Sequence, residues 1–290
     1  MRFGFIHAHA RIFHICTMCR VLEVSRAGYY AWRARPLCER VKADVVLYAK
    51  VHAIHARTRG RYGSPRIHGA LRNAGCRCGK KRVARLMREH QLRGTPRRAF
   101  RVTTQSAHAA PVAPNHLQRQ FAVSAVPALD RTWAADITYI PTAEGWLYLA
   151  VVLDLKSRRV VGWAMRTQLE QDLTLAALRM ALLHRGARGV LHHSDRGVQY
   201  ASHAYQRLLA GAGCTPSMSR TGDCWDNAVV ESFFATLTKE LLALESFPSR
   251  AAACRAIVEF IEIWYNRQRL HSALGYQTPA DFEAALERAA

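Results

Sequence analysis

The spacing of apolar positions along the chain predicts helices in its first part and alternating strands and helices in its second part. Residues 15–33 predict a short helix, a turn and a second helix, with Ser25 as the N-cap of the second helix. Two short helices joined in this way are typical of a helix-turn-helix. We expect this motif to form a first domain at residues 1–45.

A second basic helix-turn-helix module is predicted at residues 46–101. Ser64 is the expected N-cap of its first helix, with Pro65 as the first helical residue and Gly75 just past the end. A partner helix is expected from about residue 80 to residue 90. Its inward apolar stripe consists of Val83, Leu86 and Met87. Its outer face is basic and consists of Lys80, Lys81, Arg82, Arg85 and Arg88.

The second part of the chain predicts an α/β fold. Residues 102–128, rich in Ala, Pro, Ser and Gln, are expected to form a linker. Strands at 132–140, 146–154 and 159–165 predict an antiparallel meander. The later elements are strands at 190–193 and 215–219, a helix with Leu173, Ala177, Met180 and Leu183 on one face, and helices at about 203–210, 226–242, 250–266 and 279–288.

This order of elements is that of a ribonuclease-H-like fold. We expect a ribonuclease-H-like catalytic core at 129–245, built on a mixed five-stranded sheet flanked by helices. Residues 246–290 are expected to form a C-terminal helical extension of that core.

The excess of positive over negative charge is confined to the first part of the chain. The formal net charge is +21, and residues 1–128 hold 25 Lys and Arg against 4 Asp and Glu. Residues 129–290 hold 17 against 17. Charges of nearly one sign favour phosphate contacts, and therefore DNA binding, over helical hairpins whose charges are merely solvated.

The sequence has no apolar run near the roughly 20 residues that cross a bilayer. The first 19 residues lack the uninterrupted apolar segment of a signal peptide. We therefore expect a cytoplasmic protein, associated with the nucleoid when it is bound to DNA, and no membrane partner. The eight cysteines are expected to be free thiols, because Cys16 and Cys19 lack a second ligand pair at zinc-finger spacing.

Three acids carry the candidate chemistry. Asp136 interrupts an otherwise largely apolar strand, Asp195 follows the fourth strand, and Glu231 lies in the long helix. Converging carboxylates repel each other, so the arrangement predicts a cage for two Mg²⁺ ions that bind the attacking and leaving oxygens of a phosphodiester. With water as nucleophile such a site nicks DNA, and with the resulting 3′-OH it joins the strand to a new phosphate.

Several motifs carry a resemblance to a known family. They are Gly28-Tyr29-Tyr30-Ala31-Trp32, Tyr62-Gly63-Ser64-Pro65-Arg66-Ile67, Trp133 with Asp136-Ile137-Thr138-Tyr139, His193-Ser194-Asp195-Arg196-Gly197, Trp225-Asp226-Asn227-Ala228 leading to Glu231-Ser232-Phe233-Phe234, and Tyr265-Asn266 to Tyr276-Gln277-Thr278-Pro279. With these motifs the chain resembles OrfB-type transposases of bacterial insertion sequences. Those proteins are relatives of retroviral integrases and have a DDE catalytic core.

The resemblance implies a DNA transposase that acts on terminal inverted repeats and target DNA. It implies Asp136, Asp195 and Glu231 as catalytic and metal-binding residues, and Mg²⁺ as cofactor with Mn²⁺ as a substitute. It also implies an upstream OrfA-type protein, as fusion or complex, and a homo-oligomer in the working complex.

One position departs from the family pattern. Such proteins commonly carry a basic residue seven positions after the glutamate, where this chain has Thr238, followed by Lys239. The candidate DNA-binding residues are Arg66, Lys80, Lys81, Arg82, Arg85, Arg88 and Lys239.

Other polar residues have structural interpretations. Asp154 is expected to begin a turn, and Asp226 and Asn227 to cap the helix that carries Glu231. Core positions are expected at Ile261 and Trp264, and His192 and His193 are expected to be packed or hydrogen-bonded. Arg267, Arg269 and His271 fit DNA contact and a structural role equally well.

Two other functions fit parts of the pattern. A ribonuclease-H-like nuclease would share the acids but would not need the basic modules. A DNA-binding regulator with an inactive core would not need all three acids, and all three are present.

Overall fold

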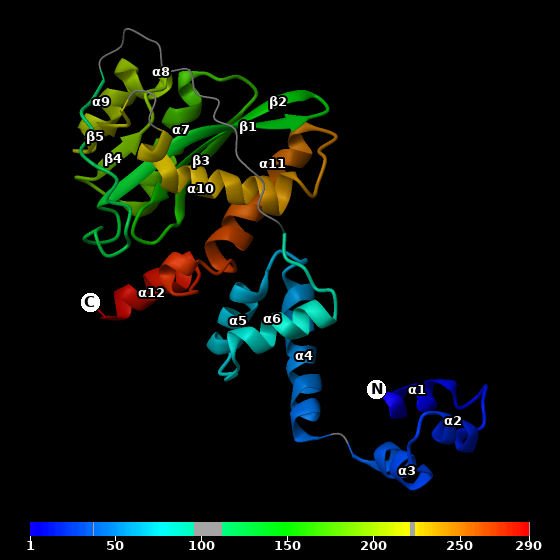
Figure 1. Ribbon diagram of the computed structural model, residues 1–290. Coiled ribbons are helices and arrows are strands. Elements are labelled where there is room, and N and C mark those ends of the chain that lie inside the picture. The colour runs from blue at the N-terminus through cyan, green and yellow to red at the C-terminus, as the bar shows by residue number, and fades with distance from the viewer. Residues whose placement is uncertain (37, 96–111, 221–223, 290) are drawn as a thin grey trace. The chain divides into compact units, whose positions relative to one another are not determined.

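In the computed structural model the chain forms two units, Met1–Ala53 and Ile54–Ala290 (Figure 1). The structure describes residues 1–36, 38–95, 112–220 and 224–289, so residues 96–101 of the second predicted module and 102–111 of the predicted linker lie outside it. The predicted domain boundary at residue 45 falls inside helix α4, Glu39–Arg57, which the sequence pattern did not indicate. The two units divide after Ala53, which also lies within α4.

The first unit contains both predicted helices, a further helix before them and most of α4. Its first three helices are α1 Arg2–His9, α2 Ile15–Val21 and α3 Arg26–Ala34. Its apolar core consists of Ile6, Met18, Cys19 and Tyr29. Ser25 caps α3 as predicted, because its Oγ accepts a hydrogen bond from Gly28 N at 3.0 Å.

The second predicted helix pair is also present. Its helices are α5 Ser64–Asn73 and α6 Lys80–Glu89, and the predicted stripe of Val83, Leu86 and Met87 is buried. Ser64, however, is helical and Gly63 is the N-cap. Pro65 in the first turn has no N–H, which leaves one donor fewer to cap, so α5 begins without a side-chain cap.

The rest of the second unit is built on a five-stranded mixed sheet in the order β3-β2-β1-β4-β5. Its strands are β1 Thr132–Thr142, β2 Gly145–Asp154, β3 Val160–Arg166, β4 Leu191–Ser194 and β5 Thr215–Met218. The first three form the predicted antiparallel meander, and β4 and β5 extend the sheet in parallel from β1. The ribonuclease-H-like fold predicted from the order of elements is confirmed.

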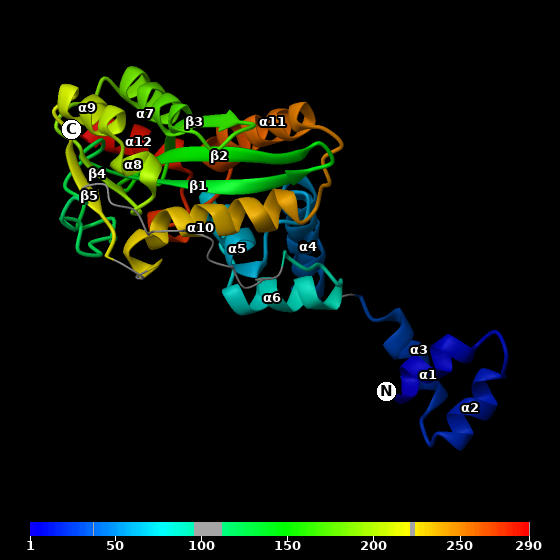
Figure 2. The same cartoon turned by 90° about the horizontal axis from the view of Figure 1, so that it is seen from above.

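Helices cover both faces of the sheet (Figure 2). One face packs on α7, Gln171–Arg185, in a core that includes Trp133, Val152 and Leu178. The other face packs on α10, Ala228–Leu237, and α11, Arg250–Val258. The remaining elements are α8 Val198–Ala201, α9 His203–Gly211, η1 Cys224–Asn227, η2 Thr238–Leu242, η3 Glu259–Tyr265, η4 Ser272–Leu274 and α12 Pro279–Ala289.

Two of the predicted long helices change their winding along their length. The helix predicted at 226–242 begins as the 3₁₀ turn η1 and ends as the π-helix η2, and the helix predicted at 250–266 ends as the π-helix η3. Within the described ranges, no helix is both long enough and apolar enough to cross a membrane.

The described part of the predicted linker, residues 112–128, belongs to the second unit. It has no helix or strand, but Leu117 and Val126 are buried. Its backbone is tied to the sheet domain, since His116 N donates to Ser217 Oγ at 3.0 Å and Lys156 Nζ donates to Val126 O at 2.6 Å. These contacts make residues 112–128 a packed segment and correct the prediction of a free linker.

A close approach of α7 to β3 yields a test of the core. A Cβ at Gly162 would collide with the carbonyl oxygen of Ala177 and lie 2.8 Å from Ala181 N. Both atoms belong to the α7 backbone and cannot turn aside, so Gly162→Ala should lower the free energy of unfolding by about 3 kcal/mol, measured by urea denaturation. Gly211→Ala in α9 is the matched control, because no atom lies within 4 Å of its Cβ. Equal losses in both variants would contradict the predicted clash.

Candidate active site

The pairing of β1 with β4 brings two of the three acids together. The last pair of this parallel ladder is Ala135 with Ser194. Asp136 and Asp195 are the next residues of the two chains, so they lie side by side at the end of the ladder. Asp136 is on the sheet face opposite Trp133 and Ala135, both of which belong to the core beneath α7. The two aspartates therefore lie on the face that α10 covers.

The third acid comes to this place on α10. Asn227, the N-cap residue of α10, donates from Nδ2 to the carbonyl oxygen of Ala135 at 3.2 Å. That bond fixes the start of the helix beside Asp136. Glu231 follows four residues later, which is about one helical turn along the same side.

The electrostatics of Asp136 reflect this convergence. Burial raises the pKa of its carboxyl well above the usual value, and the negative charges of Asp195 and Glu231 raise it further. A hydrogen bond from Ile137 N at 2.8 Å acts in the opposite direction. Burial also raises the pKa of Glu231. The site thus concentrates carboxylates that repel each other in a poorly solvated place.

The donor set of the site fits a hard divalent cation. All three candidate ligands are carboxylates, whose oxygens suit Mg²⁺ and Mn²⁺ better than softer metals. Within the parts of the chain that the structure describes, no three His, Cys, Asp or Glu side chains meet closely enough to hold a metal ion as they stand. The fold brings the three acids into one region, but their side chains do not lie close enough together to coordinate one metal ion.

Asp226 has a different role from the predicted one. Asn227 makes no side-chain cap bond on α10, and the fully buried carboxylate of Asp226 binds arginines instead. Arg220 Nη2 and Arg119 Nε lie 2.9 and 2.7 Å from its Oδ1. The hydrogen bonds from Arg220 hold the pKa of Asp226 well below its usual range. Asp226 therefore fastens residues 119 and 220 to the turn that precedes α10, an arrangement that sequence spacing did not indicate.

The two histidines before Asp195 are packed, as predicted. Both are at most 1% exposed. His192 Nε2 lies 3.1 Å from Tyr205 Oη, and His193 Nδ1 lies 2.9 Å from Ser217 Oγ. Burial lowers the pKa of His192 to about 3 and that of His193 to about 4, so both rings are neutral at physiological pH.

Asp154 forms the predicted turn. Its Oδ1 accepts hydrogen bonds from Lys156 N at 2.9 Å and Ser157 N at 2.7 Å. The predicted core residues Ile261 and Trp264 are buried.

Tyr200 was not singled out from the sequence. Its side chain is 1% exposed, and its hydroxyl has no hydrogen-bond partner among the described residues. Burial raises its pKa well above the usual value, and so do the charges of Asp136 and Asp195. The one feature of the sequence that could have indicated Tyr200 is its place five residues after Asp195.

The candidate DNA-binding residues differ in the exposure of their side chains. The exposed side chains are Lys80, Lys81 and Arg88 on α6, while those of Arg82, Arg85 and Lys239 are half-buried. Arg85 is bound to Glu89 at 3.0 Å. Arg66 binds the protein itself, because Nε donates to Leu270 O at 3.1 Å and Nη1 lies 3.6 Å from Glu240 Oε1. Arg66 therefore has a structural role within the protein.

Of the three polar residues left open near the C-terminus, two have structural roles. Arg269 and His271 are buried, whereas Arg267 is exposed.

A sheet of this order with an acid at the end of the β1–β4 ladder and another on the covering helix defines the class of polynucleotidyl transferases with a ribonuclease-H-like core. Domain models agree with this class. A model described as "Integrase core domain" matches residues 127–224, and a second of the same description matches residues 212–279. A model described as "HTH-like domain" matches residues 42–100.

Two relatives match nearly the whole chain. "Transposase InsF for insertion sequence IS3A" of Escherichia coli (strain K12) is 42% identical over 98% of each chain. "Insertion element IS600 uncharacterized 31 kDa protein" of Shigella sonnei is 44% identical over 91% of this chain and 97% of its own. The chain belongs to the IS3 family of bacterial insertion-sequence transposases.

Solved structures match less closely. A chain of the simian T-cell lymphotropic virus intasome with PP2A regulatory subunit B56 gamma has a TM-score of 0.45 at 15% identity, covering 80% of this chain and 74% of that one. The HTLV-2 integrase catalytic core domain in complex with magnesium has a TM-score of 0.41 at 18% identity, covering 53% and 96%. Family membership follows from the domain models and the relatives.

The raised pKa of Asp136 predicts a stability effect. The folded state holds the Asp136 proton more tightly than the unfolded state does, so ionised Asp136 destabilises the fold as pH rises above its unfolded pKa. In EDTA at pH 7, Asp136→Asn should raise the free energy of unfolding by about 1 kcal/mol, and this gain should shrink as the pH falls. Chemical denaturation at several pH values measures it. Asp172→Asn, at an exposed carboxylate, is the control, and a gain that grows on acidification would contradict the sign.

Proposed function

We propose that Asp136, Asp195 and Glu231 are the catalytic carboxylates with which this transposase cuts DNA at the ends of its insertion element and joins them to target DNA. The observation that carries the proposal is the β1–β4 register, which places Asp136 beside Asp195 on the face covered by the helix of Glu231. The negative charges of both Asp195 and Glu231 raise the pKa of Asp136, as expected for converging carboxylates.

The proposed cofactor is a pair of Mg²⁺ ions, with Mn²⁺ as a substitute. When bound, such ions supply positive charge to the attacking and leaving oxygens of the phosphodiester. The protein's own part is to hold three carboxylates where that charge is needed. Asn227 positions the helix of Glu231 against β1, and Gly197 N holds Asp195 Oδ1 at 2.9 Å.

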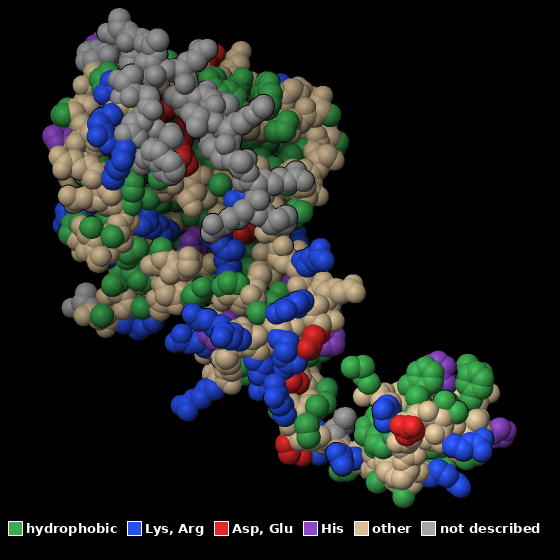
Figure 3. Space-filling view, viewed as in Figure 1, with side chains coloured by type: hydrophobic (Ala, Val, Ile, Leu, Met, Phe, Trp, Pro, Cys, Tyr) green, Lys and Arg blue, Asp and Glu red, His purple; other side chains and the backbone are tan. Residues whose placement is uncertain are grey.

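The proposed DNA contacts lie on helix α6. Its residues Lys80, Lys81, Arg82, Arg85 and Arg88 share the surface away from its buried stripe. Figure 3 shows Lys and Arg side chains gathered over α5 and α6. Cations of one sign on one helix suit phosphate oxygens, which fix the position of DNA without reading its sequence. Lys239, two turns after Glu231, is a further proposed contact to the element end.

The proposed working complex contains more than one copy of the chain, because two element ends must be joined to one target. An upstream OrfA-type protein, as fusion or complex, is proposed to contribute recognition of the terminal inverted repeats. We also propose that the two helical modules bind DNA and that the protein is cytoplasmic and resides on the nucleoid when bound.

A cleavage assay tests the catalytic role of Glu231. Glu231→Gln keeps the size of the side chain but removes its charge, so cleavage and joining of labelled element-end DNA with Mg²⁺ should fall by about 1000-fold or more. DNA binding should persist. The matched control is Glu287→Gln, at an exposed glutamate of α12. Hydrolysis without joining would support a nuclease instead, and binding without any cut, even with Mn²⁺ and the OrfA-type partner, would support an inactive regulator.

The salt dependence of binding tests the role of α6. Replacing Lys80 and Lys81 with Ala should reduce the slope of log K against log salt by about 0.9 for each phosphate that these lysines neutralise. The affinity should fall similarly for element-end DNA and unrelated DNA, because phosphate contacts carry no sequence information. Fluorescence anisotropy at several salt concentrations measures the slope. An unchanged slope would remove α6 from the proposed DNA interface.

A further inference from the structure

The α5–α6 module, residues 61–94, is fastened to the segment that follows η3. Tyr62 Oη accepts a hydrogen bond from Leu270 N at 2.8 Å and donates one to Gln268 O at 3.1 Å. Tyr62 is 2% exposed, so these bonds lie inside the protein. From the neighbouring turn of α5, Arg66 Nε donates to Leu270 O at 3.1 Å. The module and residues 268–270 are therefore joined by directional bonds shielded from water.

Glu240 connects these contacts of Tyr62 and Arg66 to the helix that carries Glu231. It lies in η2, the direct continuation of the helix of Glu231, and is 4% exposed. Its carboxylate accepts hydrogen bonds from Trp264 Nε1 at 2.9 Å and from Arg269 Nη2 at 3.0 Å. Arg66 Nη1 completes the cluster at 3.6 Å. The buried carboxylate of Glu240 thus links the α5–α6 module, the segment that contains Trp264 and Arg269, and the helix that carries Glu231.

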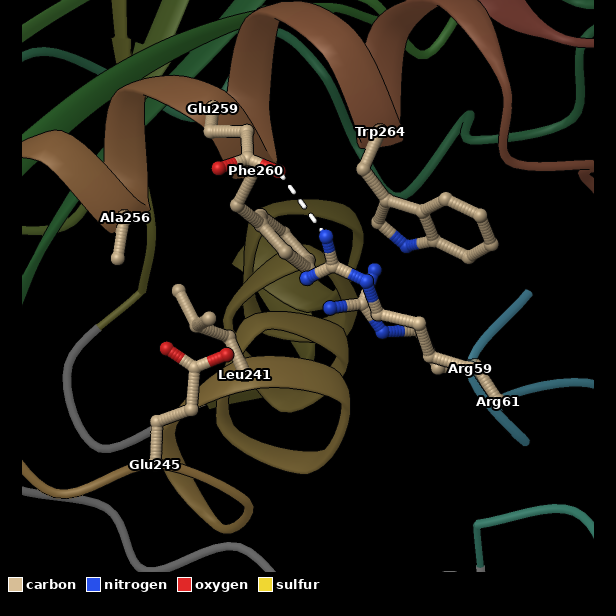
Figure 4. A pocket seen from close by; sticks show the side chains of 8 residues that line it. All are labelled: Arg59, Arg61, Leu241, Glu245, Ala256, Glu259, Phe260 and Trp264. Carbon is tan, nitrogen blue, oxygen red and sulfur yellow. Dashed lines mark hydrogen bonds and ion pairs between the residues drawn. The ribbon is translucent and has the colours of Figure 1, made fainter. Parts of the chain in front are cut away.

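A second arginine of the module lies against the same surface (Figure 4). The guanidinium of Arg61 lies 4.6 Å from the ring centroid of Trp264 and 6.0 Å from that of Phe260. Beside it is a cavity of about 30 Å³, which has room for about two water molecules. The cavity is too small for a larger ligand, so the surface serves to join parts of the protein.

The packing here is also sterically close. A Cβ at Gly69 of α5 would lie 2.8 Å from Cγ and Cδ1 of Tyr276. Asn73 Nδ2, one turn later, donates to Tyr276 O at 2.8 Å. Only glycine permits α5 to approach this segment so closely.

Buried ion pairs add little stability compared with apolar contacts, but they specify one arrangement because any shift leaves a charge unpaired. We propose that the Arg66–Glu240–Arg269 cluster is a positioning device that sets the distance between α6 and Glu231. DNA phosphates held by α6 then determine which phosphodiester reaches the three carboxylates. This inference rests on the proposed function, and it adds that the site of cutting is measured from the α5–α6 module.

The test maps the cut positions on end-labelled element-end DNA with Mg²⁺, using the full chain. Glu240→Gln weakens both arginine interactions without removing a cation from α6. The fraction of cuts at the wild-type phosphodiester should fall about tenfold or more, with new cuts at neighbouring positions, because a shift of about 1 Å costs on the order of 100-fold in rate. DNA affinity should change less than about twofold, because the phosphate-binding cations are intact.

The matched control is Glu283→Gln. Glu283 is 3% exposed and binds Arg159 and Arg185 at 2.6 and 3.1 Å, away from the fastening. The Glu283→Gln variant should lower the stability of the protein without changing the position at which the DNA is cut. If Glu240→Gln lowers stability or rate while every cut stays at the wild-type position, the cluster is only structural and the inference is overturned. If the unaltered protein makes no cut at all, the proposed function fails and this inference fails with it.

A second variant displaces the module without touching its charges. Gly69→Ala should spread the cut positions in the same way, because its Cβ pushes against Tyr276. Adding Tyr276→Gly removes the opposing ring and should restore a single position, and glycine suits the positive φ of 66° at residue 276. Unchanged cut positions in Gly69→Ala would overturn the inference even if Glu240→Gln did not fold.

Discussion

The parallel pairing of β4 with β1 is the constraint on which the rest of the structure depends. It ends at Ala135 and Ser194, and so presents Asp136 and Asp195 as neighbours where backbone bonding stops. Parallel strands need a crossover connection, which β3 and α7 provide while burying the opposite face of the sheet. Only the α10 face is left for the acids. The fold therefore concentrates negative charge at one point, which suits a site that binds divalent cations.

Helix α10 and its continuation η2 connect this point to the α5–α6 module of the second unit. At one end Asn227 binds β1, and at the other end Glu240 binds Arg66 and Arg269. The winding changes from α to π between the two ends, which turns Glu240 toward the C-terminal segment. A single helical element thus carries both Glu231 and the carboxylate that holds the α5–α6 module.

Local patterns predicted the elements well, because each depends on neighbouring residues. The strands began and ended within one or two residues of expectation, and Ser25 capped α3. Predictions failed where a distant partner decided the outcome. Asp226 looks like a cap residue in sequence, but Arg119 and Arg220 bind it. Residues 112–128 look like a linker, but Ser217 and Lys156 hold them. The sequence likewise did not indicate that Glu240 and Leu270 bind Arg66.

The sequence by itself determined the order of the strands and of most helices, the confinement of the excess positive charge to the first part of the chain, and the positions of the three acids along these elements. Those features follow from periodicity, turn residues and composition, which are local. Tertiary structure alone decided which arginines bind the protein itself, and how the α5–α6 module is joined to the helix that carries Glu231. Such interactions link residues far apart in the chain, as from Arg66 to Leu270, and no spacing along the chain encodes them.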